Sequence, residues 1–315
     1  MSSGSASSCA DGGPPYVDAA RVAAAVPMAD AVRAVEDALR GPAPDDPPRT
    51  AVDVAAGQLL LMPSQSAHAV GVKLAAVAPG NPGLGLDRIQ GVYVLLDGRT
   101  LVPTLLVDGV ALTNLRTPAV SAVSAAWLAV PDAAELVVFG SGPQAWGHVL
   151  AMRTVRPVRR VRVVGRDAGR AADLVGRVRH LGLEADVATA GAICDADIVC
   201  LCTTARTPLF DGQLLPEHAH VVAVGSHEPD AREVDATTLA RSYLVVEDRA
   251  TALREAGDVV LALQERAIGH DHLRADLREL VADSVDHAQR LTLFKSVGMA
   301  WEDLAVAELV KRRCA

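Results

Sequence analysis

Residues 135–145 read ELVVFGSGPQA, and this stretch decides the fold. Its first part, Leu136 to Phe139, is a short continuous apolar run, which predicts a strand buried on both faces. The six residues that follow predict a tight turn into a helix that begins near Trp146. In such a turn the first glycine permits the bend, the second lets the backbone approach a pyrophosphate, and the alanine keeps the helix close to the sheet. We therefore predict a dinucleotide-binding turn made by Gly140, Gly142, Pro143, Gln144 and Ala145.

Four more apolar runs follow this turn, mostly separated by helical stretches. They are VRVVG at 161–165, DIVCLC at 197–202, HVVAVG at 220–225 and YLVVED at 243–248. Runs of this kind, joined by connections of this length, predict right-handed βαβ units in a parallel sheet with helices on both faces. A glycine-rich loop with a purely structural role would leave this alternation unexplained. The fold class predicted here is α/β, with a Rossmann-type doubly wound sheet.

The rest of the chain has a different spacing of apolar residues. Residues 17–40 have helical apolar spacing, which predicts a helix or a helix pair. Residues 50–110 contain short apolar runs separated by Gly, Pro, Asn and Asp, as in strands linked by hairpins. A helix of small residues is expected over 118–134, and the tail, 284–312, is expected to be helical. The order is thus an α+β region, the doubly wound region and a helical tail.

Composition excludes several classes of protein. The 315 residues carry a net charge of −8 and contain no long basic tract, which argues against a nucleic-acid or anionic-membrane partner. No apolar run reaches the roughly 18–20 residues that span a bilayer. Residues 1–14 lack the charged and apolar regions of a signal peptide, so we expect a disordered lead-in. We expect a cytoplasmic protein.

The cysteines and histidines show no pattern of a disulfide framework or a metal site. The five cysteines are Cys9, Cys194, Cys200, Cys202 and Cys314. Two of them lie in or beside the apolar run Ile198 to Leu201, which predicts buried free thiols at Cys200 and Cys202. No metal-ligand spacing is evident, and His68 or His287 alone would be an ordinary surface residue.

The end of the second strand bears on the choice of cofactor. An NAD-selecting site usually has Asp or Glu there, to bind the ribose hydroxyls. This chain has Arg166 at that position and Arg170 one helical turn on, and a guanidinium suits a 2′-phosphate. The sequence therefore favours NADPH, with NAD(H) as the alternative. Arg166 could instead be a solvated residue at a helix start, and the neighbouring Asp167 keeps that interpretation open.

Several further segments together resemble one family. They are Gly71-Val72-Lys73-Leu74, Pro79-Gly80-Asn81-Pro82, Leu112-Thr113-Asn114-Leu115-Arg116-Thr117, the glycine turn, Phe294-Lys295-Ser296-Val297-Gly298-Met299-Ala300 and Glu302-Asp303-Leu304. Over about residues 20–310, the chain resembles the ornithine cyclodeaminase/mu-crystallin family. The pairing of the Arg-Thr segment with the Lys-Ser-Val-Gly segment is specific to this family.

The resemblance implies a homodimer of two-domain subunits. Residues 15–117 with 295–315 would form an α+β substrate-binding and dimerisation domain, and residues 118–294 the Rossmann domain. Family chemistry is nicotinamide-linked work on small amino or imino acids. Members include cyclodeaminases, ketimine reductases, amino-acid dehydrogenases and crystallin-like binding proteins.

The resemblance also implies a substrate carboxylate site formed by Arg49, Lys73 and Arg116. Two guanidinium groups and an ammonium group can recognise one small anion by charge-assisted hydrogen bonds. The sequence itself places Lys73 in an apolar strand, where a cation is costly unless it is paired or functional. An isolated lysine there could otherwise point to solvent from an edge strand. Met62 matches a pocket-lining position, and a core methionine is the alternative.

Other family positions concern the nicotinamide end of the site. The resemblance places Thr117, Thr203, Thr204, Ser296, Val297 and Gly298 near the cofactor. In Gly225-Ser226-His227-Glu228-Pro229-Asp230, cyclodeaminases of the family carry Asp two residues before the proline, where this chain has His227. An imidazole is a poorer partner than a carboxylate for an ω-ammonium group. This departure disfavours deamination of ornithine or lysine, although His227 could simply pack on the cofactor.

The leading hypothesis is therefore NAD(P)H-dependent reduction of a small cyclic or linear ketimine to an α-amino acid. Binding and orientation by the carboxylate site would dominate catalysis, and Lys73 or His227 would protonate the imine. A cyclodeaminase that recycles NAD and an amino-acid dehydrogenase remain alternatives. A crystallin-like binding protein with little turnover is a further alternative, which the presence of Lys73 and Arg116 disfavours.

Overall fold

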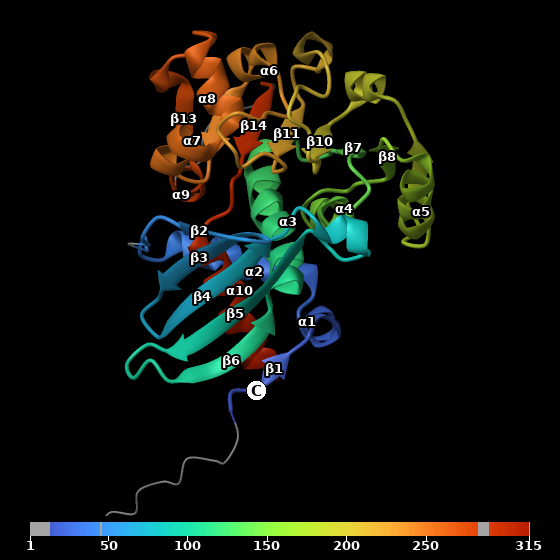
Figure 1. Ribbon diagram of the computed structural model, residues 1–315. Coiled ribbons are helices and arrows are strands. Elements are labelled where there is room, and N and C mark those ends of the chain that lie inside the picture. Colours follow the sequence, from blue (N-terminus) through green and yellow to red (C-terminus); the bar gives the residue numbers. More distant parts are fainter. Residues whose placement is uncertain (1–12, 45, 283–289, 315) are drawn as a thin grey trace, which may run out of the picture.

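The structure is a computed structural model that describes residues 13–44, 46–282 and 290–314. Figure 1 shows two sheets, one above the other, with the long helix α3 running between them. The expected disorder of residues 1–14 falls mostly outside the described residues, as do Cys9 and His287.

The lower part of the molecule is a six-stranded sheet in the order β1-β6-β5-β4-β3-β2. Its strands are antiparallel except for β1, which pairs with β6 in parallel. This confirms the hairpin-linked strands expected within residues 50–110. The strands are β1 (Tyr16–Val17), β2 (Thr50–Val54), β3 (Gly57–Gln65), β4 (Ala69–Val77), β5 (Ile89–Asp97) and β6 (Pro103–Asp108).

The inner face of this sheet packs on helices. The expected helix pair is present as α1 (Ala19–Ala25) and α2 (Met28–Arg40). The C-terminal helix α10 (Ala300–Cys314) contacts β3, β4 and β5, and also packs against α2. Strand alternation directs Lys73 of β4 and Tyr93 of β5 onto this inner face, where both side chains are buried.

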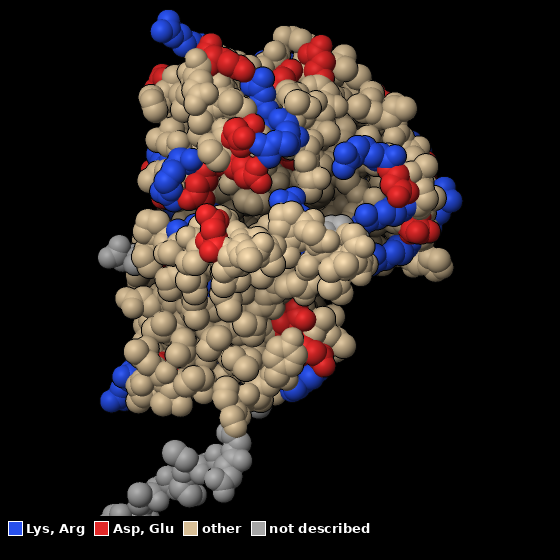
Figure 2. Space-filling view, viewed as in Figure 1, with Lys and Arg blue, Asp and Glu red and all other residues tan. Residues whose placement is uncertain are grey.

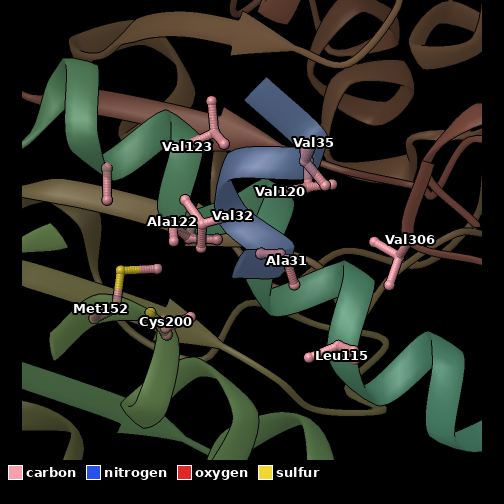
Figure 3. Close-up of a cluster of buried hydrophobic side chains, with 14 of the residues drawn as sticks. Ala31, Val32, Val35, Leu115, Val120, Ala122, Val123, Met152, Cys200 and Val306 are labelled. Atoms are coloured by element: carbon pink, nitrogen blue, oxygen red, sulfur yellow. The ribbon is translucent and has the colours of Figure 1, made fainter. Parts of the chain in front are cut away.

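Helix α3 (Gly109–Leu128) joins the two sheets and begins nine residues before the expected start at 118. Asp108 causes the earlier start, because its side chain accepts a hydrogen bond from the Ala111 amide at 2.8 Å and caps the helix. The expected domain boundary between residues 117 and 118 thus lies inside one helix. Figure 3 shows apolar side chains of α2, α3, α4 and α10 beside Cys200, so one core extends from the lower region to the upper sheet.

The upper part is an eight-stranded sheet in the order β13-β12-β14-β11-β10-β7-β8-β9, and every pairing is parallel. All five strands that the apolar runs predict are present, and the Rossmann-type α/β class is confirmed. The strands are β7 (Glu135–Phe139), β8 (Arg160–Val164), β9 (Glu184–Val187), β10 (Ile198–Leu201), β11 (His220–Ala223), β12 (Tyr243–Val246), β13 (Leu273–Asp276) and β14 (Thr292–Lys295).

Helices surround this sheet. The helix of the glycine turn begins at Pro143 rather than near Trp146, since Gly142 already serves as its N-cap. The helices are α4 (Pro143–Val155), α5 (Ala168–Arg179), α6 (Ala236–Arg241), α7 (Arg249–Glu255), α8 (Gly257–Gln264) and α9 (Leu277–Ala282). None of the helices in the described part of the chain is long and apolar enough to cross a membrane.

The expectation of a wholly helical tail was wrong for residues 292–295. These residues form β14, which lies between β11 and β12 near the middle of the parallel sheet. The last strand in the chain thus enters a gap that only the folded sheet provides. Strands β9 and β13 were also not predicted. Cys200 is a buried free thiol as expected, whereas the free thiol of Cys202 is only half-buried.

Candidate active site

The glycine turn has the geometry that a dinucleotide needs. Gly140 has a φ of +109°, and a Cβ atom there would lie 2.5 Å from the carbonyl oxygen of Cys202. Only glycine fits this position, because a side chain would be both strained and in collision. Within the described chain no side chain caps α4, so the amides of its first turn remain available to bind an anion. The turn therefore fits a pyrophosphate.

Helices α3 and α4 approach closely beside this turn. A Cβ atom on Gly147 would lie 2.6 Å from the Pro118 side chain, so the contact requires glycine. Gln144 of the turn donates a hydrogen bond to Asn114 of α3 at 2.9 Å. Thr117 follows one turn later on α3 and is buried. The Leu112–Thr117 segment and the glycine turn are thus held together through Asn114 and Gln144.

Arg166 and Arg170 lie exposed beyond the end of β8. A Cβ atom on Gly142 would lie 4.0 Å from Nη2 of Arg170, which places this guanidinium beside the glycine turn. Asp167 caps α5 by accepting a hydrogen bond from the Arg170 amide at 3.0 Å. No ion pair of Arg166 or Arg170 is found among the described residues.

A buried glutamate, which the sequence analysis missed, links the ends of β10 and β11. Glu233 accepts hydrogen bonds from the amide and hydroxyl of Thr203 at 2.9 and 2.7 Å, and from the Gly225 amide at 2.7 Å. Burial raises the pKa of Glu233. Thr203 is therefore held by the fold, whereas the neighbouring Thr204 is exposed.

A buried lysine supports the loop that carries His227. Lys295, at the end of β14, forms an ion pair with Asp258 at 2.8 Å and donates to the carbonyl of Ser226 at 2.6 Å. Lys295 and Asp258 are both almost completely buried. The matched pair explains how a cation is tolerated in the middle of the sheet.

Lys73 and Arg116 come together against the start of α10. Lys73 forms an ion pair with Asp303 at 2.7 Å, and Arg116 contacts Asp303 at 3.3 Å and Glu302 at 2.5 Å. All four side chains are buried. We call Lys73, Arg116, Glu302 and Asp303 the clamp. The Glu302-Asp303 pair was part of the recognised motif, but its role as counter-charge was not predicted.

The clamp keeps capacity for a further anion. Nη2 of Arg116 has no acceptor in the described chain, and it lies 2.9 Å from where a Cβ atom of Gly298 would stand. Burial, followed by the charge of Arg116, lowers the pKa of Lys73 to about 8, against the opposing effect of Asp303. Lys73 can therefore exchange a proton near neutral pH, which an ordinary lysine cannot.

Arg49 reaches the same place from the loop before β2. Its Nη2 donates to the carbonyls of Val297 and Gly298 at 3.0 and 2.8 Å, and its Nε pairs with Glu255 at 2.9 Å. Arg49, Met62 and Gly298 line a cavity of about 400 Å³. Met62 also lies opposite Lys73 in the β3–β4 pairing. The predicted carboxylate-binding residues therefore meet around Gly298.

His227 lies on the loop after β11, with an exposed side chain. Partial desolvation by the surrounding protein and the charge of Arg49 lower the pKa of His227. Both effects favour the neutral ring, and Arg49 lies near enough to His227 to act on it.

The structure thus brings together most residues that the sequence singled out. Around Gly298 lie Arg49, Met62, Lys73, Arg116 and the loop of His227, while the glycine turn and the two arginines after β8 lie along the sheet edge. Ser296 is buried, and Val297 and Gly298 donate their amides to Glu247 at 2.9 and 2.8 Å. Within the described ranges, no group of three or more His, Cys, Asp or Glu residues is arranged to hold a metal ion.

Comparison with known proteins agrees with this architecture. A model of the ornithine cyclodeaminase/mu-crystallin family matches residues 16–315. The chain is similar to a Δ1-pyrroline-2-carboxylate/Δ1-piperideine-2-carboxylate reductase of Azospirillum brasilense. The two are 35% identical over 267 residues, which cover 84% of each chain.

Solved structures share the same fold over nearly the whole chain. One is Δ1-pyrroline-2-carboxylate reductase of Thermococcus litoralis in complex with NADH and L-proline. It has a TM-score of 0.89 and 30% identity, and the match covers 95% of this chain and 96% of that chain. Another is an archaeal alanine dehydrogenase dimer with bound NAD, with a TM-score of 0.90, 27% identity and coverage of 95% of each chain.

The clamp leads to a prediction about stability. Asp303→Asn removes the carboxylate that pairs with Lys73 and Arg116, and so leaves buried cations without full compensation. We expect the free energy of unfolding to fall by about 3–5 kcal/mol, measured by urea denaturation. Glu308→Gln on the same helix is the control. Within the described residues Glu308 accepts a hydrogen bond from Ser66, which the glutamine oxygen can still accept, so this change should cost no more than about 1 kcal/mol. Equal effects of the two variants would contradict a stabilising role for the buried pair.

Proposed function

We propose that this chain, which belongs to the ornithine cyclodeaminase/mu-crystallin family, uses NAD(P)H to reduce a small cyclic or linear ketimine to an α-amino acid. The observation that carries this proposal is the buried clamp at Gly298, directly beside the loop that follows β14. A clamp that presents cationic donors at the edge of a dinucleotide-binding sheet suits a substrate with one carboxylate.

The substrate carboxylate would bind to the free donors of Arg116 and Lys73. Asp303 holds both cations in place, so little side-chain freedom is lost when the anion binds. Arg49 would hold the other side, since it already joins the Val297 and Gly298 carbonyls. The imine carbon would then face the carboxyl edge of the sheet, and the contribution of the protein is mainly orientation.

A reduced nicotinamide held at the carboxyl edge of the sheet would supply the hydride, and the imine nitrogen must take up a proton. Lys73 is the residue we assign to this step, because its pKa of about 8 makes it a stronger acid than an ordinary lysine. Loss of its proton to the imine leaves a neutral amine beside Asp303. The pKa of His227 is lowered by desolvation and by Arg49, which disfavours its protonated form and makes it a weaker candidate for the donor.

The relatives support the same substrate class. The relatives described above include reductases named for cyclic imino acids, and one structure contains L-proline together with NADH. A Δ1-pyrroline-2-carboxylate-type acid is therefore the first substrate to test. Within that class, the clamp would recognise the carboxylate of the substrate and Lys73 would recognise its imine nitrogen.

We expect Δ1-pyrroline-2-carboxylate to oxidise NADPH or NADH, followed as the loss of absorbance at 340 nm. Lys73→Met should lower kcat/KM by about 10²–10⁴-fold, because it removes the proton donor. Lys311→Met is the control, since Lys311 lies on the far part of α10 and contacts Thr104. In the wild type, kcat/KM should fall as the pH rises above about 8, where Lys73 loses its proton. Unchanged activity of Lys73→Met would rule out this assignment.

For the cofactor, the relatives support a nicotinamide dinucleotide, and we propose a preference for NADPH. Arg166 and Arg170 are exposed, Arg170 stands beside the glycine turn, and the adjacent Asp167 is engaged as a helix cap. Asp167 is therefore less available to the ribose hydroxyls, while two guanidinium groups remain for a 2′-phosphate. The glycine turn, Thr117, Thr203 and Ser296 to Gly298 would hold the rest of the cofactor, with Thr204 at its margin.

The double substitution Arg166→Ala/Arg170→Ala should raise KM for NADPH at least tenfold and leave KM for NADH nearly unchanged. The reason is that only NADPH carries the phosphate that these side chains would bind. Arg160→Ala is the control, because Arg160 lies at the opposite end of β8 and pairs with Glu184. Equal changes for both cofactors would speak against a phosphate-selective role.

We further propose that two copies associate through the outer face of the six-stranded sheet. Strand alternation places apolar side chains on this face, where a monomer would normally carry polar residues. Figure 2 shows that the centre of this face carries few charged side chains. The apolar residues on this outer face include Val52, Leu59, Leu61, Val72, Leu74, Val92, Val94 and Leu106. Residues 15–117 with 295–315 would then act as substrate-binding and dimerisation domain, and residues 118–294 as dinucleotide-binding domain.

A charge on this face should break the dimer. Leu61 is 37% exposed in the single chain, so Leu61→Glu leaves the subunit fold intact but buries a carboxylate in the dimer. We expect the mass measured by size-exclusion chromatography with light scattering to shift from two subunits toward one. Leu84→Glu, at a 76% exposed position outside the strands, should leave the mass unchanged. A wild-type monomer would disprove the association.

A further inference from the structure

Two buried carboxyl groups meet behind the clamp. Glu302 lies in the first turn of α10, and Glu247 follows the end of β12. Glu302 is fully buried and Glu247 nearly so. Both side chains lie at the contact of Arg116 with Gly298, since Glu302 accepts a hydrogen bond from Arg116 and Glu247 accepts one from the Gly298 amide. The charge of Glu247 also acts on Glu302. Two ionised carboxylates cannot hydrogen-bond to each other, because each offers only acceptors, whereas one shared proton would join them.

The other oxygens of both groups are already engaged. Oε2 of Glu302 accepts from Arg116, and Oε2 of Glu247 accepts from the amides of Val297 and Gly298. The Oε1 atoms of the two glutamates are buried and receive no hydrogen bond from a donor group of the described residues. These two Oε1 atoms can therefore share a proton with each other. Burial, and next the charge of Glu247, raises the pKa of Glu302 well above its usual value.

The charges around this pair determine what its proton does. On α3 Arg116 faces both glutamates, on β4 Lys73 faces Glu302, and on α10 itself Asp303 lies next to Glu302. Arg49 and Arg254 share one partner, Glu255, which lies outside the clamp. If Glu247, Glu302 and Asp303 were all ionised, Lys73 and Arg116 would face three anions, which would weaken their attraction for a substrate carboxylate. One proton removes this excess.

We propose that Glu247 and Glu302 share one proton and that this proton sets the affinity of the clamp for a carboxylate ligand. The inference rests on the proposed function for the identity of that ligand, but not for the existence of the proton. Glu302 is a positioning residue here, because it acts through Arg116. Glu247 connects the same proton to the Val297-Gly298 turn, whose carbonyls hold Arg49.

The direction of the pH dependence follows from the charges. A bound carboxylate brings negative charge to Arg116 and thereby favours the protonated state of the pair. By linkage, protonation of the pair favours binding of the carboxylate, and loss of the proton at higher pH weakens it. For one linked proton the dissociation constant rises by up to about tenfold per pH unit above the pKa of the pair in the free protein.

The proton itself can be observed without ligand or turnover. Infrared spectra of the wild type at pH 7 should contain the carbonyl stretching band of a buried protonated carboxylic acid, which shifts in D₂O. Glu302→Gln and Glu247→Gln should each lower the intensity of this band, Glu308→Gln should leave it unchanged, and Glu233→Gln identifies any contribution from Glu233. A missing band in the wild type, or an unchanged intensity in both Glu302→Gln and Glu247→Gln, would overturn the proposal.

Affinity provides the second readout, with L-proline as the probe in the presence of NADH. The dissociation constant of the protein with Glu302 should rise with pH more steeply than that of Glu302→Gln, because the neutral amide mimics the protonated acid at every pH. Both proteins carry Lys73→Arg in this comparison, because Lys73 titrates near pH 8 and is coupled to Glu302, whereas arginine keeps its charge at every pH of the experiment. A constant ratio from pH 6 to 10 would overturn the linkage. If the protein reduces the imine but shows no infrared band, the shared proton is refuted and the proposed function stands. If the band is present but no imine is reduced, the proposed function is refuted and the shared proton stands.

Discussion

The compensation of buried charge at the start of α10 is the constraint on which the rest of the structure depends. Lys73 comes from the six-stranded sheet, Arg116 from α3, and Glu302 and Asp303 from the C-terminal helix. Three distant segments must therefore meet before either cation can leave water. Because α3 also packs on α4 beside the glycine turn, the same contacts fix the distance between the carboxylate site and the dinucleotide site.

Buried carboxylates play a second structural role at the carboxyl edge of the parallel sheet. Glu233 binds the backbone after β10 and β11, and Glu247 binds the backbone after β14. Each holds amides of loops that would otherwise leave unpaired donors at this edge. These loops surround the place where substrate and nicotinamide would meet. A rigid edge costs little reorganisation when a ligand binds, which suits a reaction in which orientation is the main contribution of the protein.

Much of the fold could be predicted because its signals are local. The five longest apolar runs of the α/β region are strands, and the glycine turn is a turn before a helix. Strands β9, β13 and β14 could not be predicted in the same way. The first two, EADV and LRAD, contain charged residues and no continuous apolar run. Strand β14 depends on its partners β11 and β12, which are far away in the chain. The start of α3 was misplaced because one capping side chain, Asp108, outweighed the composition of the segment.

The sequence by itself determined the type of each half of the molecule, the need for glycine at position 140 and the cation Lys73. These follow from apolar period, backbone sterics and the cost of a cation in an apolar strand, which are all local properties, whereas Arg116 was named through the family resemblance. Only the tertiary structure decided how the cations are compensated and which carboxyl groups meet. Glu247 and Glu302 are 55 positions apart in the chain, and their contact arises where β12 and α10 converge. Charge coupling depends on distance in space and on burial, and neither can be read from the order of residues.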